Sequence, residues 1–176
     1  LQSALHALVQ QHPQGLWRVR LQLQASGGLD VQAFACPASP AQVRLQWASA
    51  PLAEAHGEFV RFKTTRRDHY ERWAPHDADV FDTLLWNEEG ELTECTRGSI
   101  AALLDGRWTT PPLACGLLPG VGRAVALAQG RLTEGVITVA DAPRVTAWAF
   151  VNSLRGWLPA DVQGQPPAMP TITARP

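Results

Sequence analysis

The most reactive candidate in this sequence is its only lysine. The 176-residue chain has fourteen arginines but a single lysine, Lys63, which follows the β-prone segment 58–62 (EFVRF). Arginine stays protonated at accessible pH, whereas a lysine amine can lose its proton and attack a carbonyl carbon. A solvated surface lysine is the ordinary alternative. The position therefore makes Lys63 a candidate Schiff-base residue.

A second candidate, Glu94, lies 31 residues after Lys63. It comes at the end of a predicted hairpin strand and is followed by small and polar residues at 95–99 (CTRGS). A glutamate leaving a strand is usually a solvated edge residue. The functional alternative is a carboxylate that faces a heterocyclic nitrogen and keeps that nitrogen protonated.

A third candidate is the segment 118–123 (LPGVGR), which has the form of a helix start with proline near the first turn. Glycines there let backbone N–H groups approach an anion, and the helix dipole favours a phosphate. Alone, a Pro-Gly pair at a helix start is mostly structural. The pattern suits one phosphate monoester, because the chain has no G-x-x-x-x-G-K-[ST] loop to cradle a diphosphate.

An amine for a Schiff base, a carboxylate for a ring nitrogen and a phosphate cup are what pyridoxal 5′-phosphate needs from a protein. At these residues the chain resembles the class IV aminotransferases. These fold-type IV pyridoxal-phosphate enzymes include branched-chain and D-amino acid transaminases and 4-amino-4-deoxychorismate lyase. The segments that carry the resemblance follow in order between residues 62 and 156: Lys63, 90–95 (GELTEC), 108–112 (WTTPP), 116–120 (GLLPG) and 150–153 (FVNS).

The resemblance implies a role for each matching residue. Lys63 would bind the cofactor covalently, and Glu94 would pair with the pyridine nitrogen N1. The implied phosphate donors are the backbone N–H groups of Val121 and Gly122, with Ser153 as an extra donor. The implied substrate contacts are Arg66, Arg67 and Asn152. No metal site is expected.

The chain departs from the family pattern at three positions. The family often has threonine where Gly122 stands and asparagine where Ser99 stands. Its transaminases place a tyrosine five residues after the lysine, where this chain has Asp68, with Tyr70 two residues further on. The last departure argues against a transaminase in particular.

The segments 63–67 (KTTRR) and 152–156 (NSLRG) most resemble the lyase-type domain fused behind aminodeoxychorismate synthase component I. The leading expectation is therefore a lyase that converts 4-amino-4-deoxychorismate to 4-aminobenzoate and pyruvate. Two alternatives stay open. One is a class IV transaminase for branched-chain or D-amino acids, and the other is a truncated module without activity of its own.

Short strands and few helices must position these residues. Apolar alternation predicts strands at 17–23, 29–33, 43–47, 58–62, 80–86, 92–95, 100–104, 107–110, 135–139 and 149–152. Helices are expected at 1–12, 66–73 and 143–148, with another opening within 116–123 and ending near 129. This is an α+β fold.

The resemblance divides the chain into three parts. Residues 51–158 would be the fold-type IV cofactor-binding large domain, with antiparallel strands in a pseudo-barrel and flanking helices. Residues 1–50 would be the helix and hairpin that end the small α/β domain, and 159–176 a Pro-rich tail. The family's arginine-bearing His-Leu-x-Arg segment would then precede Leu1 in a longer parent protein.

Composition limits the function classes. A net charge of −1 gives no electrostatic case for nucleic acid or an anionic membrane surface, and no apolar stretch approaches the length of a membrane span. Three scattered cysteines, Cys36, Cys95 and Cys115, suggest reduced thiols in a cytoplasmic protein. The expected partners are a small-molecule substrate, a second copy in a homodimer, and synthase component I, by fusion or association.

Overall fold

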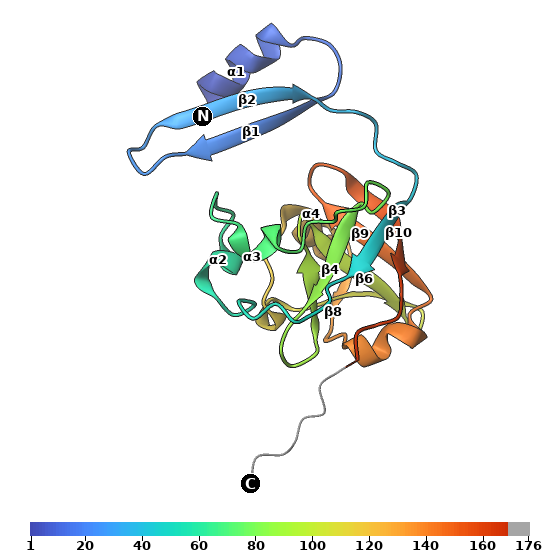
Figure 1. Ribbon diagram of the computed structural model, residues 1–176. Coiled ribbons are helices and arrows are strands. Elements are labelled where there is room, and N and C mark those ends of the chain that lie inside the picture. The colour runs from blue at the N-terminus through green and yellow to red at the C-terminus, as the bar shows by residue number, and fades with distance from the viewer. Residues whose placement is uncertain (169–176) are drawn as a thin grey trace. The chain divides into compact units, whose positions relative to one another are not determined.

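The computed structural model describes residues 1–168 and divides the chain into two compact units (Figure 1). The first unit ends at Ser39 and the second begins at Pro40. This boundary lies about ten residues before the one expected from the sequence, because strand β3 (Val43–Trp47) belongs to the sheet of the second unit.

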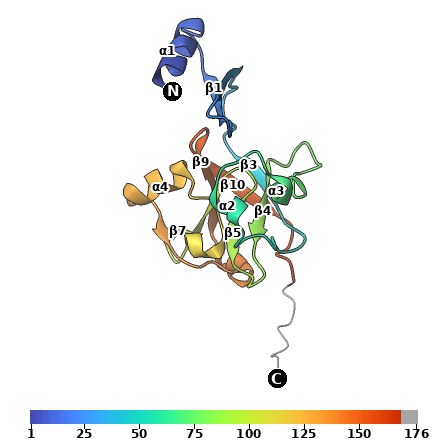
Figure 2. The same cartoon turned by 90° about the vertical axis from the view of Figure 1, so that its left-hand side faces the viewer.

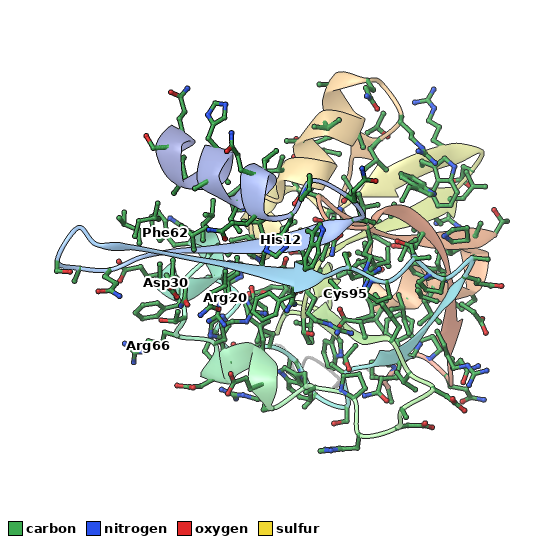
Figure 3. All side chains as sticks on the ribbon, turned by 90° about the horizontal axis from the view of Figure 1, so that it is seen from above. His12, Arg20, Asp30, Phe62, Arg66 and Cys95 are labelled. Atoms are coloured by element: carbon green, nitrogen blue, oxygen red, sulfur yellow. The ribbon has the colours of Figure 1, made fainter. Side chains whose placement is uncertain are left out.

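The first unit is a helix and a hairpin, as predicted. Helix α1 (Gln2–Gln11) buries none of its side chains. Strands β1 (Trp17–Leu23) and β2 (Leu29–Ala35) pair antiparallel from Trp17 opposite Ala35 to Leu23 opposite Leu29. The ring of His12, labelled in Figure 3, lies 4.0 Å from the ring of Trp17, so the helix end contacts the hairpin start.

The second unit is built on one mixed sheet of eight strands in the order β5-β4-β3-β10-β9-β6-β7-β8. Their bounds are β4 (Asp82–Trp86), β5 (Leu92–Cys95), β6 (Ser99–Leu104), β7 (Arg107–Thr110), β8 (Thr133–Glu134), β9 (Ala147–Asn152) and β10 (Gly156–Gln163). Three pairs are parallel, namely β3 with β4, β3 with β10, and β7 with β8. The core of this unit includes Leu45, Leu84, Ile100 and Phe150, all fully buried.

Short helices accompany the sheet (Figures 1 and 2). They are α2 (Glu58–Arg61), α3 (Asp68–Glu71) and α4 (Val121–Ala128), with 3₁₀ turns at Leu113–Cys115 and Val139–Arg144. Within residues 1–168, none of the helices has the length and apolar character needed to cross a membrane.

The strand predicted at 58–62 is wrong, since this segment forms helix α2. Only Val60 of the four helical residues is buried, so one apolar side chain anchors the turn, and within residues 1–168 no strand pairs with it. Glu58 in the first turn and Arg61 in the last turn also suit the helix dipole.

The strand predicted at 135–139 and the helix predicted at 143–148 are also displaced. The side chains of Thr138 and Asp141 form a reciprocal capping box, which starts a 3₁₀ turn at Val139. That turn ends at Arg144 and frees Ala147 to begin β9. The short strand in this region is β8, at Thr133–Glu134.

The Pro-rich tail expected at residues 159–176 begins later than predicted from the sequence. Residues 159–163 belong to β10, in which Leu158 and Ala160 are buried and Pro159 and Asp161 are exposed. This strand pairs with β3 on one side and β9 on the other. The remainder of the expected tail, residues 169–176, lies outside the described residues.

Candidate active site

One cavity of about 280 Å³ in the second unit collects most of the predicted site residues. It is lined by seven of the eight: Lys63, Arg67, Glu94, Val121, Gly122, Asn152 and Ser153. These residues come from the segment between α2 and α3, the end of β5, the start of α4 and the end of β9. Segments far apart in the sequence therefore meet at one place, as the functional interpretation requires.

Glu94 lies near the end of β5 with its side chain buried, so it is not a solvated edge residue. Its Oε1 atom accepts two hydrogen bonds, from Tyr70 Oη at 2.6 Å and from the backbone N–H of Leu118 at 3.0 Å. No hydrogen bond to Oε2 comes from the described part of the chain. One oxygen is fixed by the protein, and the other remains for a donor in the cavity.

Burial sets the protonation of this carboxyl group. Loss of water raises the pKa of Glu94 to about 7, against the opposing effects of the hydrogen bonds from Tyr70 and Leu118 and of the positive charges of Arg67 and Lys63. A positively charged ring N–H at Oε2 would favour the ionised form further. The site therefore holds a carboxylate whose charge depends on what it faces.

Lys63 lies in the irregular segment that joins α2 to α3. The segment turns at Thr64, whose hydroxyl oxygen accepts a hydrogen bond from the backbone N–H of Arg66 at 3.2 Å. Lys63 is exposed and lines the cavity, and no hydrogen bond or ion pair within residues 1–168 engages its amine. Its position is compatible with attack on a carbonyl group bound there.

The two predicted substrate arginines differ in placement. The guanidinium of Arg67 donates to the carbonyl oxygen of Thr96 at 2.6 Å and lies 4.7 Å from the centre of the Tyr70 ring. Arg66 does not line the cavity. It is exposed, points away from its unit in Figure 3, and stacks on the ring of Phe59 at 4.3 Å.

The first turn of α4 is open to an anion. Gly120 caps the helix without a side-chain hydrogen bond, and the first helical bond runs from Ala124 N–H to the Gly120 carbonyl. Within residues 1–168, no acceptor engages the backbone N–H groups of Val121 and Gly122. Both residues line the cavity, so two donors at the positive end of an eight-residue helix face it.

Close packing explains the glycine at position 122. A Cβ atom there would lie 2.6 Å from the carbonyl carbon of Asn152 and 2.9 Å from the backbone nitrogen of Ser153. The start of α4 is thus pressed against the end of β9, and a threonine would not fit without movement. This contact brings Ser153 beside the two free N–H groups.

Asn152 has a structural function in addition to lining the cavity. Its Oδ1 atom accepts hydrogen bonds from the backbone N–H groups of Leu154 and Arg155, and its Nδ2 atom donates to the carbonyl of Arg97. These bonds close the turn after β9 and tie it to the turn between β5 and β6. Asn152 therefore shapes the wall of the cavity.

Two contributors were not predicted as site residues. Asp82, fully buried in β4, accepts hydrogen bonds from the Thr96 hydroxyl at 2.6 Å and the Arg97 backbone N–H at 3.1 Å, which fixes the turn behind Glu94. Tyr70 binds Glu94 directly. Its one sequence signal was that it is the only tyrosine in the chain and lies seven residues after Lys63.

The groups around the cavity suit a phosphorylated pyridine aldehyde. The buried carboxylate with one open oxygen fits a protonated ring nitrogen, the uncapped helix start fits one phosphate, and the amine of Lys63 fits the aldehyde. The fold and the site together define a protein of the pyridoxal-phosphate-binding class.

Comparison with known proteins agrees with this class. A family model described as amino-transferase class IV matches residues 1–161, so the chain belongs to the class IV aminotransferase family. Membership in this family indicates pyridoxal 5′-phosphate as the cofactor and fold-type IV as the architecture.

Both of the activities considered are assigned to individual relatives. The chain is 31% identical over 122 residues to a protein of Schizosaccharomyces pombe provisionally assigned as an aminodeoxychorismate lyase, covering 66% of this chain and 53% of that protein. The chain thus spans about half the length of this curated relative. A Mesorhizobium loti structure provisionally assigned as an amino-acid aminotransferase is 32% identical with a TM-score of 0.82, covering 92% of this chain and 81% of that one.

A more distant structure supports the fold alone. A Legionella pneumophila protein provisionally assigned as a 4-amino-4-deoxychorismate lyase is 20% identical with a TM-score of 0.70, covering 81% of this chain and 56% of that one.

Proposed function

We propose that this chain is the catalytic part of a pyridoxal-phosphate lyase that converts 4-amino-4-deoxychorismate to 4-aminobenzoate and pyruvate. The observation that carries the proposal is the meeting of Lys63, Glu94 and the open start of α4 around one cavity. The name of the Schizosaccharomyces pombe relative supports the lyase assignment.

A second observation favours the lyase over a transaminase. Transaminases of the family place a tyrosine five residues after the lysine, where this chain has Asp68. Asp68 is exposed and is not among the residues that line the cavity, and the hydroxyl of Tyr70 is engaged by Glu94. The transaminase remains the second candidate, because the Mesorhizobium loti structure is of similar identity and carries that assignment.

In the proposed reaction each residue has a defined task. Pyridoxal phosphate, when bound, supplies an electron sink. Lys63 Nζ would anchor the cofactor, and as a free amine it would take the proton from the ring carbon of the substrate that bears the amino group. Glu94 Oε2 holds the proton on the ring nitrogen. The N–H groups of Val121 and Gly122, with Ser153, hold the phosphate. The C–O bond to the enolpyruvyl group would then break with its electrons on the leaving oxygen, the ring would become aromatic, and the proton taken by Lys63 would pass to the enolpyruvate to give pyruvate.

Borohydride reduction tests the anchor. The protein is incubated with pyridoxal phosphate, reduced, digested and mapped, and we expect the pyridoxyl label on Lys63. Lys63→Arg keeps the positive charge but cannot form the Schiff base, so it should carry label only on the N-terminal amine, the one other primary amine that the sequence supplies. Label elsewhere in that variant, or a wild-type protein without a bound-cofactor absorbance band, would contradict the proposal. Absence of the absorbance band in the wild type would support the alternative of a truncated module without activity of its own.

The reaction is tested by omitting the amino acceptor. With 4-amino-4-deoxychorismate as the only substrate, a lyase releases 4-aminobenzoate and pyruvate in equal amounts without any 2-oxo acid. A transaminase turns over amino acids only when 2-oxoglutarate or pyruvate is supplied. If product formation depends on added 2-oxo acid, the lyase activity is contradicted and the transaminase activity is supported.

We extend the proposal to assembly and location. The first unit exposes several large apolar side chains, which supports a homodimer and a fused or associated synthase component I as partners; they are Leu1, Val9, Leu16, Val19, Leu21, Leu23, Leu29 and Phe34. Cys36, Cys95 and Cys115 are free thiols, which supports a cytoplasmic location. Light scattering of purified protein, alone and mixed with component I, tests the partners, and cell fractionation tests the location.

A further inference from the structure

Tyr70 is a polar residue at the cavity to which neither the family resemblance nor the proposed reaction gives a task. It lies in α3, seven residues after Lys63, and only 6% of its surface is exposed. Buried tyrosine hydroxyls usually have a hydrogen-bond partner, and here the partner is Glu94 Oε1 at 2.6 Å. The hydroxyl of Tyr70 therefore binds the Glu94 carboxylate and is not left free in the cavity.

The bonding at Glu94 is divided between its two oxygens. Tyr70 Oη and the backbone N–H of Leu118 both donate to Oε1, from two different elements of the chain. Two donors on one oxygen fix the rotation of the carboxylate, so that Oε2 is the oxygen left for a ring nitrogen. A carboxylate held by Leu118 alone would be free to exchange its oxygens.

The tyrosine ring is itself held in place. The guanidinium of Arg67 lies 4.7 Å from the ring centre and is anchored by its bond to the Thr96 carbonyl. The charged groups near the Glu94 carboxylate are Arg67 and Lys63, both positive. Tyr70 is thus a neutral donor with a fixed orientation beside a buried anion.

We infer that Tyr70 is a positioning residue, which holds Glu94 so that Oε2 faces the cofactor's ring nitrogen and keeps its proton in place. This inference rests on the proposed function, because it takes pyridoxal phosphate as the occupant of the cavity. The donated hydrogen bond also favours the ionised carboxylate and so opposes the effect of burial on the pKa of Glu94.

Tyr70→Phe removes the hydroxyl and keeps the ring under Arg67. The matched control is Thr110→Val, which removes a fully buried hydroxyl that donates to the Ile100 carbonyl at 2.8 Å, away from Glu94. In cofactor-free protein, ¹³C NMR of glutamate side-chain carbons follows the titration of Glu94. We expect its pKa to rise by about one pH unit in Tyr70→Phe and to stay unchanged in Thr110→Val.

A second measurement changes the donor without a substitution. Tyr70 is the only tyrosine, so growth on 3,5-difluorotyrosine modifies this one hydroxyl and makes it a stronger donor. The pKa of Glu94 should then fall below its wild-type value. In loaded protein, ¹⁵N NMR of labelled pyridoxal phosphate should show a smaller protonated fraction of the ring nitrogen in Tyr70→Phe than in the wild type or Thr110→Val.

The outcomes separate this inference from the proposed function. Wild-type protein that takes up no cofactor would overturn the proposed function, and with it the role of Tyr70 toward a ring nitrogen. Normal cofactor uptake together with an unchanged Glu94 titration in Tyr70→Phe, or an unchanged protonated fraction of the ring nitrogen, would overturn the role of Tyr70 alone.

Discussion

Replacing Glu94 by glutamine should make the cofactor-free protein more stable at neutral and alkaline pH. The amide oxygen of glutamine can accept both hydrogen bonds that Glu94 Oε1 now accepts, from Tyr70 and from the Leu118 N–H. The substitution therefore keeps the contacts and removes only the ability to ionise in a buried position.

The sign and the pH window follow from the pKa of Glu94, which burial raises from 4.5 to about 7. Between these values the folded state binds the proton more tightly than the unfolded state, so the wild type loses stability as the pH rises through this window. Each pH unit corresponds to about 1.4 kcal/mol, which makes the total loss about 3 kcal/mol. The glutamine variant has no such loss.

Urea unfolding followed by tryptophan fluorescence, at intervals from pH 4 to pH 8, measures the difference in unfolding free energy. We expect the advantage of Glu94→Gln over the wild type to grow by about 3 kcal/mol across this range and to level off above pH 7. Glu88→Gln, a change at an exposed glutamate, is the matched control and should show a constant difference. A constant difference for Glu94→Gln as well would refute the argument that burial controls this carboxyl group.

Two further predictions concern the walls of the cavity. Gly122→Ala places a Cβ atom against the end of β9, so it should lower the unfolding free energy by about 1–3 kcal/mol and weaken cofactor binding in a fluorescence titration, whereas Gly28→Ala, in the hairpin turn, should change stability by less than about 0.5 kcal/mol. Equal stability of the two variants would contradict the close packing of α4. Arg67→Ala should weaken cofactor binding in the same titration and Arg66→Ala should not, because Arg67 alone of the two lines the cavity. A larger loss of cofactor binding in Arg66→Ala than in Arg67→Ala would contradict the placement of Arg66 outside the cofactor site.

Residue type alone singles out several residues that the structure brings to one cavity. A single lysine and a glutamate at a strand end stand out by type, and the helix start at 118–123 stands out by its proline and glycines. The hairpin of the first unit and β3, β5, β6 and β7 were also found, because their apolar alternation is regular and their turns carry glycine or aspartate.

The errors have physical causes that a local pattern does not contain. The local pattern predicts a strand where helix α2 lies because EFVRF is β-prone, and only the tertiary burial of Val60 decides otherwise. Proline and glutamine predict that residues 159–163 belong to an irregular tail, although these residues pair with β3 on one side and β9 on the other. Tyr70 was missed as a site residue since its partner lies 24 residues away.

The position of β10 also has a consequence for the order in which the protein folds. This strand lies in the middle of the sheet, yet it is the last strand within residues 1–168, and its parallel partner β3 is the first strand of the same unit. Ribosomes deliver a protein from its N-terminus, and contacts between distant segments form slowly. The pairing that joins β3 to β9 through β10 therefore cannot form until residues 156–163 have been made. The sheet that positions the residues of the cavity is accordingly completed only after β10 has joined it.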